Sequence, residues 1–129
     1  MATPSRPIDA YKALIDQLVN ETSHSVTARI VVERGIFPET SANAVFNDLV
    51  RTLAPERRKL LGQMLNDERM GAIHDALAVL TWWISSQGLG LTFLGESMPV
   101  ELSGAGLHGD YIGRRDGWEW PNDGDPAGA

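Results

Sequence analysis

Apolar residues recur every three to four positions through the first two-thirds of the chain, which is the spacing of amphipathic helices. The clearest stripe lies within residues 41–53 and predicts a helix there, capped by Thr40 or Ser41. We expect the face that carries this stripe to be buried in a core. Its apolar positions are Ala42, Val45, Phe46, Leu49, Val50 and Leu53.

Three other stripes predict helices. The first covers residues 7–20, and the second begins at Pro55, which suits a first helical position. The third covers residues 67–87, is capped by Asn66 or Asp67, and ends at Gly88; we expect it to be the central helix. Trp82 and Trp83 on this helix are expected to lie chiefly in the core, with one of the two near the surface because adjacent residues cannot both face one core. The predicted buried stripes are Tyr11, Leu14, Ile15 and Leu18; then Leu60, Leu61, Met64 and Leu65; then Met70, Ile73, Leu77, Leu80 and Ile84.

Residues 25–34 fit two kinds of element. Their β-branched side chains favour a strand. Ser25, however, is a good N-cap, and Gly35 stands where a left-handed residue commonly ends a helix. We favour a short helix.

Beyond Gly88 the apolar period changes from helical to two, which is typical of strands. Residues 89–102 are predicted to form a β-hairpin that turns at residues 95–97, with Pro99 on an edge. A short helix is expected over residues 106–115, and residues 121–129 read as a flexible tail. The fold class is therefore mainly α, with the hairpin packed on a compact domain of four to five helices.

Composition narrows the class of protein. The 129 residues, 43% of them hydrophobic, suit one domain, which we place at residues 1–120. The absence of cysteine excludes disulfides and thiol chemistry. The net charge of −6 argues against binding to nucleic acid or to anionic membranes. With no membrane span or secretory signal apparent, we expect a cytoplasmic protein.

Residues 70–121 resemble a family of small bacterial proteins that has no assigned activity. The resemblance rests on the run from Gly71 to Leu77, the run from Leu91 to Val100, and the run from Leu107 to Pro121; residues 11–16 match more loosely. It implies a bacterial origin and a compact helical domain. It brings no catalytic or binding residues with it.

Two groups of polar residues are candidates for chemistry. His74 and Asp75 are adjacent, as are metal ligands in HD-type phosphohydrolases, and together with His108 and Asp110 they offer ligand types suited to zinc or iron. The alternative is that these side chains only form structural hydrogen bonds. The spacing is not diagnostic, and we expect no metal or other cofactor.

The second group lies near the C-terminus and consists of Asp110, Tyr111, Arg114, Arg115, Trp118 and Trp120. An arginine stacked on a tryptophan makes a good recognition surface, and it equally well fastens a C-terminal segment to the core. We favour the fastening role.

The sequence predicts a binding protein rather than an enzyme. It would bind a protein partner, as an immunity protein, an antitoxin or a regulatory protein does. The candidate binding surface combines both groups of residues named above: His74, Asp75, His108, Asp110, Tyr111, Arg114, Arg115, Trp118 and Trp120. A homodimer is compatible with the sequence. The alternative function is a small metal-binding protein or hydrolase that uses His74, His108 and Asp110.

Overall fold

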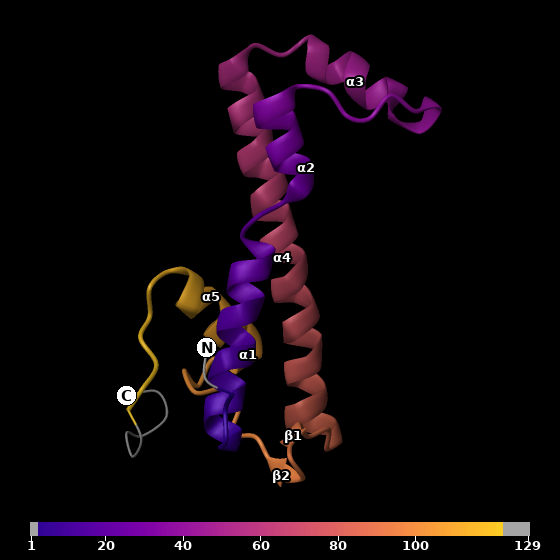
Figure 1. Ribbon diagram of the computed structural model, residues 1–129. Coiled ribbons are helices and arrows are strands. Elements are labelled where there is room, and N and C mark those ends of the chain that lie inside the picture. The colour runs from indigo at the N-terminus through magenta and orange to yellow at the C-terminus, as the bar shows by residue number, and fades with distance from the viewer. Residues whose placement is uncertain (1–2, 123–129) are drawn as a thin grey trace. The chain divides into compact units, whose positions relative to one another are not determined.

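The computed structural model describes residues 3–122, and in this part of the chain the fold is mainly helical with one small hairpin, as predicted (Figure 1). The chain divides into two compact units. Unit 1 comprises residues 1–21 and 72–129, and unit 2 comprises residues 22–71. The single domain expected from the length of the chain stays a prediction. Within residues 3–122, no helix has both the length and the apolar character needed to cross a membrane.

Helix α4 (Pro55–Gln87) replaces the two helices predicted over this region and runs for 33 residues. The predicted break at Asn66 and Asp67 is wrong. The Asn66 side chain does not cap a new helix, because its Oδ1 accepts a hydrogen bond from the Ser25 backbone N–H at 3.1 Å. No glycine or proline interrupts residues 63–70, so the backbone continues as a helix through them.

Unit 1 contains α1 (Pro7–Thr22), the C-terminal part of α4, and α5 (Gly106–Arg115). The helices α1 and α5 agree closely with the predicted ranges 7–20 and 106–115. Their packing side by side buries the centre of the unit (Figure 1). The fully or almost fully buried apolar side chains here are Tyr11, Ile15, Leu107 and Tyr111.

The hairpin of unit 1 is shorter than predicted. Strands β1 (Thr92–Phe93) and β2 (Glu96–Ser97) pair antiparallel. The turn is at Leu94 and Gly95, one residue earlier than expected, and both have positive φ angles, of 50° and 81°. This is the pattern of a type I′ turn. Pairing ends soon after β2 because Pro99 has no N–H to donate.

Unit 2 contains α2 (Val26–Arg29), α3 (Ala44–Arg51) and the N-terminal part of α4. The short helix favoured for residues 25–34 is confirmed: α2 continues into a π-helical turn, Ile30–Arg34, which ends at Gly35 with a φ of 68°. Ser25 is its N-cap, since Ser25 Oγ accepts from the Ala28 N–H at 3.1 Å.

Gly62 lets the π-helical turn after α2 lie close to α4. A Cβ atom at this position would stand 2.5 Å from Val32 Cγ2, so a larger residue would force this side chain or the turn to shift. Unit 2 is a short stretch of chain, so its core is small. The buried apolar residues of this core include Ala28, Val31 and Val50.

The helix predicted over residues 41–53 is present as a 3₁₀ turn, Ser41–Asn43, followed by α3. Thr40 caps it, with Oγ1 accepting from the Asn43 N–H at 3.3 Å. The predicted burial of its apolar face is largely wrong. Val50 is buried, but Val45, Phe46 and Leu49 are 68%, 54% and 54% exposed.

Candidate functional site

The C-terminal aromatic residues of unit 1 are fastened to α1. Arg114 donates from Nε to Asp16 Oδ1 at 2.7 Å and from Nη1 to the Trp118 carbonyl at 2.7 Å. Its guanidinium carbon lies 5.2 Å from the centre of the Trp120 ring, and Trp120 Nε1 donates to Asp16 at 3.0 Å. The Trp120 ring also meets the Tyr11 ring edge to face at 5.9 Å. These contacts match the fastening role that the sequence favoured.

Asp110 lies at the centre of unit 1, with no exposed surface. Its carboxylate accepts hydrogen bonds from the Tyr11 hydroxyl and from the N–H groups of Leu102 and Ser103, the latter two at 2.8 Å. The Tyr11 oxygen in turn accepts from the Glu101 N–H at 3.2 Å. One carboxylate thereby joins α1, α5 and the loop after the hairpin.

The pKa of Tyr11 is raised far above its ordinary value of 10.0. Burial is the larger cause, and the hydrogen bond to Asp110 is the second. A raised pKa in the folded state means that its contribution to stability is complete below pH 10 and is lost as the pH rises further. Above pH 10 we expect the free energy of unfolding to fall by up to about 1.4 kcal/mol per pH unit because of this group. Urea unfolding at pH 8 and pH 11 should show the loss in the wild type. In Tyr11→Phe the difference between the two pH values should be smaller, and an unchanged difference would exclude Tyr11 as its source.

His74 and His108 approach each other in unit 1, with ring centres 5.1 Å apart. His74 Nδ1 lies 3.2 Å from Asp75 Oδ1, and His108 Nδ1 lies 3.4 Å from Thr81 Oγ1. Asp110 does not join this pair, because its carboxylate is held by Tyr11 and the two amides. In residues 3–122, no three His, Cys, Asp or Glu side chains gather closely enough to hold a metal ion.

The nine predicted surface residues therefore differ in accessibility. Asp110 and Tyr111 are fully buried, and Arg114 is engaged by α1 and Trp118. The side chains of His74 and Asp75 are 38% and 84% exposed. Arg115 pairs with its neighbour Asp116 at 3.0 Å. As a binding surface, this set stays a prediction.

Unit 2 contains an apolar groove of about 440 Å³ between α3 and the helices α2 and α4, which we call the α3 groove. Its volume is within the range of ligand-binding pockets. All but two of its lining side chains are apolar. The lining residues are Thr27, Val31, Phe37, Asn43, Phe46, Leu49, Val50, Leu61 and Leu65.

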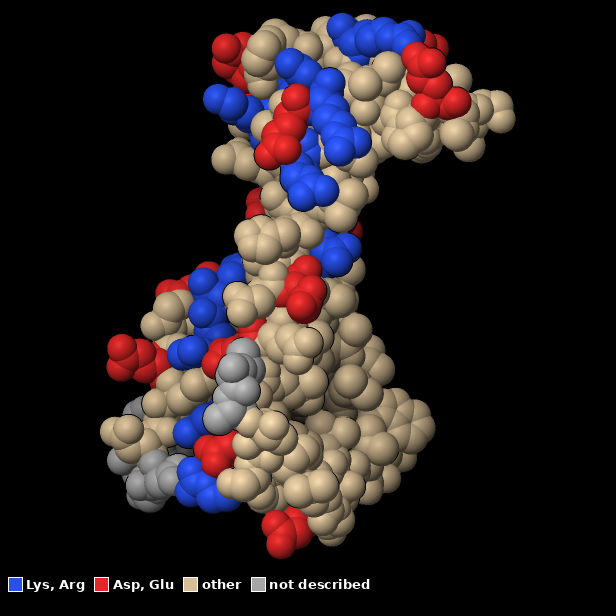
Figure 2. All heavy atoms as spheres, viewed as in Figure 1, with Lys and Arg blue, Asp and Glu red and all other residues tan. Residues whose placement is uncertain are grey.

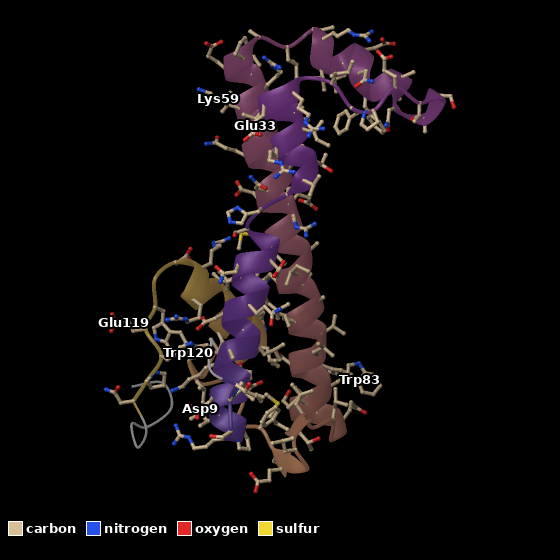
Figure 3. The ribbon with its side chains drawn as sticks, in the orientation of Figure 1. Asp9, Glu33, Lys59, Trp83, Glu119 and Trp120 are labelled. Atoms are coloured by element: carbon tan, nitrogen blue, oxygen red, sulfur yellow. The ribbon has the colours of Figure 1, made fainter. Side chains whose placement is uncertain are left out.

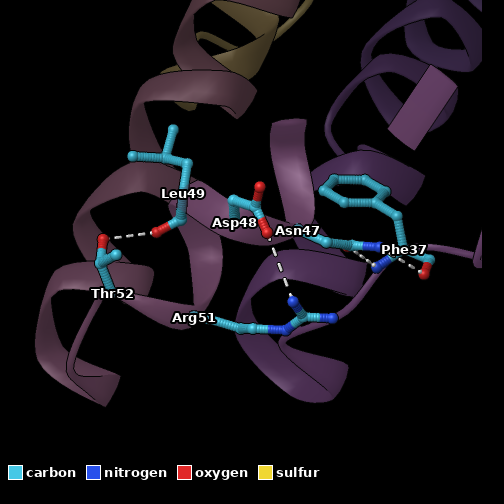
Figure 4. A network of polar contacts seen from close by, with 6 residues as sticks. All are labelled: Phe37, Asn47, Asp48, Leu49, Arg51 and Thr52. Atoms are coloured by element: carbon cyan, nitrogen blue, oxygen red, sulfur yellow. Dashed lines mark hydrogen bonds and ion pairs between the residues drawn. The ribbon is translucent and has the colours of Figure 1, made fainter. Parts of the chain in front are cut away.

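The wall of the α3 groove is held in place by one buried amide. Asn47 accepts from the Phe37 N–H at 2.7 Å and donates to the Phe37 carbonyl at 3.2 Å (Figure 4). This pair of hydrogen bonds fixes the loop before α3, and the centres of the Phe37 and Phe46 rings lie 6.2 Å apart. The α3 helix is closed at its end by Thr52, whose hydroxyl donates to the Leu49 carbonyl at 2.6 Å. The groove is thus preformed.

A larger hollow of about 580 Å³ surrounds the start of α2. Its walls include His24, Arg29 and Glu33 as well as the Ser25–Asn66 hydrogen bond. Ser25 and Asn66 hold the start of α2, and the hollow's walls are largely polar, unlike those typical of a binding pocket. The α3 groove is therefore the better candidate site.

Charge is distributed unevenly between the units. Unit 2 has seven Lys and Arg against six Asp and Glu, and unit 1 has four against eleven, which gives net charges of +1 and −7. Figure 2 shows blue side chains gathered over unit 2. On α4, Arg57 and Arg69 stand one helical turn before Leu61 and one turn after Leu65, so both ends of this groove wall are basic.

A second apolar surface lies on the unit 1 part of α4, and we call it the α4 ridge: Val79, Trp82 and Trp83. These side chains are 59%, 54% and 48% exposed. One tryptophan was expected near the surface, but the expectation that the pair lies chiefly in the core is wrong, because both are about half exposed. The two indoles meet edge to face at 5.7 Å. Trp83 projects away from α1 and α5 (Figure 3).

The periodicity marked the α3 stripe and the tryptophan pair as apolar, but the stripe and at least one of the tryptophans were predicted to be buried. The predicted stripe at the start of α4 shows the same error, because Leu60 and Met64 are 51% and 67% exposed. Periodicity identifies an apolar face but says nothing about what covers it. The signal available in the sequence was the number of apolar helix faces, which exceeds what a core of so short a chain can cover.

Comparisons with known proteins place the chain in a family without giving it an activity. No curated protein and no solved structure matches it. Residues 4–122 match the model described as "Family of unknown function (DUF6547)". Since this match covers most of the sequence, the chain belongs to the family DUF6547.

Proposed function

We propose that this protein is a protein-binding module and that the α3 groove is its binding site. The observation that carries the proposal is the exposed apolar face of α3. Val45, Phe46 and Leu49 share one side of an amphipathic helix and are 68%, 54% and 54% exposed, and the latter two line the groove. A helix face of this kind is typical of a surface that another polypeptide covers.

The chemistry of the groove favours a helix as the bound element. An amphipathic helix binds such a site by placing its apolar residues in the groove while its polar face stays in water. The basic ends at Arg57 and Arg69 would favour acidic residues beside the apolar ones. The walls offer apolar side chains rather than a basic surface, which suits a protein better than a nucleic acid backbone.

The proposal includes the broader setting expected from the sequence, namely the cytoplasm of a bacterium. The resemblance to small bacterial proteins supports this setting. No catalytic role is proposed, because His74 and His108 are not joined by Asp110.

Photo-crosslinking within the source cells tests the proposal. A benzophenone amino acid at Val45, which is 68% exposed on α3 and precedes the groove-lining Phe46, should give an adduct that contains a second polypeptide, identified by mass spectrometry. The same amino acid at Gln63, which is exposed on α4 but does not line the groove, is the matched control. Leu49→Asp should abolish the adduct formed at Val45, since a carboxylate in the apolar wall opposes binding.

Equal adducts from both positions, or none from Val45, would count against the groove as a binding site. If an adduct forms at Val45, the identity of the crosslinked chain distinguishes a different protein from a second copy of this chain.

A further inference from the structure

We propose that the occupant of the α3 groove is the α4 ridge of a second copy, so that two chains bind each other reciprocally. This inference rests on the proposed function and names the partner for the same site. One chain carries both halves of the contact: an apolar groove in unit 2 and an exposed apolar ridge in unit 1. In a twofold pair each groove receives a ridge, so the contact forms twice.

The ridge needs cover as much as the groove does. The unit 1 part of α4 carries apolar side chains on more than one face, and a face that the chain itself does not cover is left exposed to water. Within unit 1 the side with Leu77 is buried, while Val79 and the two indoles are about half exposed. Large aromatic side chains seated in an apolar pocket supply most of the affinity in many interfaces.

The spacing of residues on the two surfaces is complementary. On α4 the groove-lining Leu61 and Leu65 are flanked at the same four-residue spacing by Arg57 and Arg69. On the ridge, Val79 and Trp83 have this spacing too, and Asp75 precedes Val79 by four residues. Residues four apart lie on one helix face, so each series forms a single line of side chains.

An antiparallel arrangement of the two lines pairs apolar residues with apolar residues and an acidic residue with a basic one. Val79 then lies opposite Leu65, and Trp83 opposite Leu61, where its indole enters the groove beside Phe46. The same register places Asp75 opposite Arg69, so that a carboxylate meets a guanidinium. Every one of these pairs is equally distant in sequence from Ala72, which is the condition for a twofold axis at that residue.

Charge supports the same pairing. The ridge belongs to the unit with a net charge of −7 and the groove to the unit with +1. The Asp75 side chain is 84% exposed and is therefore available to a partner. Contact between unlike units avoids the repulsion that two units of charge −7 would meet if ridge packed on ridge.

The test is the mass of the full chain in solution, measured by sedimentation at concentrations from about 1 to 100 μM, a range that detects typical dimers. We expect a dimer of the 14.1 kDa chain. Trp83→Asp and Phe46→Asp should each weaken dimerisation by about 100-fold or more, because each removes both copies of the contact. An equimolar mixture of the two variants should recover dimers, since one groove and one ridge remain intact in the mixed pair.

A charge exchange provides a second test that leaves the apolar surfaces untouched. Asp75→Arg and Arg69→Asp should each weaken the dimer by about 3- to 10-fold. The double variant should restore it, because the pair is then reversed in both contacts. This result does not depend on whether Trp83→Asp folds, since both charged residues are exposed.

Three results would overturn the inference: a monomer at every concentration, a dimer that tolerates Phe46→Asp but not Trp83→Asp, or no recovery on mixing. The second of these would indicate packing of ridge on ridge. A monomer that still crosslinks from Val45 to a different polypeptide would overturn this inference and support the proposed function. A monomer with no such crosslink would overturn both.

Discussion

Replacing Asp110 with alanine should lower the free energy of unfolding by about 3 kcal/mol. The carboxylate is fully buried and accepts from the Tyr11 hydroxyl and from two backbone N–H groups. Without it, three donors lose their acceptor in a region that water does not reach freely. Urea unfolding followed by circular dichroism, at matched protein concentration, measures the loss.

Asp116→Ala is the matched control, because that side chain is 60% exposed and pairs only with its neighbour Arg115. We expect it to change stability by less than about 0.5 kcal/mol. Asp110→Asn should be intermediate, since the amide keeps one acceptor oxygen and turns an NH₂ group toward a backbone donor. Should Asp110→Ala be as stable as the control variant, the carboxylate would not be what joins α1, α5 and the loop.

Arg114→Ala should lower the free energy of unfolding by about 2 kcal/mol and release the segment that follows α5. This arginine bonds Asp16 and the Trp118 carbonyl, and it lies over the Trp120 ring. The value is kept modest because Asp16 is partly exposed, with 39% of its side chain accessible. Hydrogen–deuterium exchange of residues 116–122 should rise sharply in the variant.

Arg51→Ala is the control for this change, because its ion pair with Asp48 lies within α3 and does not involve the segment after α5. Arg114→Lys should recover little, since one ammonium group cannot reproduce the bonds that a guanidinium makes in two directions. Unchanged exchange in Arg114→Ala would show that the aromatic contacts alone fasten the segment.

Local signals in the sequence predicted the helices and their ends well. Ser25 and Thr40 cap the helices that they were expected to cap, and Gly35 ends its helix with a left-handed backbone. Each of these signals depends only on a few neighbouring residues. The same local rule failed at Asn66. Its side chain was predicted to cap a helix, but it accepts a hydrogen bond from the distant Ser25 N–H instead.

Long-range arrangement was beyond what the residues alone reveal. Asp110 and Arg114 were singled out as candidates, but nothing in the sequence pairs them with Tyr11 and Asp16, which lie almost a hundred positions earlier. The apolar stripes were identified correctly, and some of their members, such as Tyr11 and Leu77, are buried as predicted, but others are exposed. Whether a residue such as Phe46 is covered depends on how much surface the chain itself can supply.

The order of the two units along the chain has a consequence for biosynthesis. Unit 2 is one continuous stretch, residues 22–71, whereas unit 1 is assembled from both ends of the sequence. On the ribosome, unit 2 emerges whole and can fold early, while α1 must wait for α5 before the Tyr11 hydroxyl finds its acceptor. The hydrogen bond that closes unit 1 therefore forms only after α5 has been synthesised, later than the contacts within unit 2.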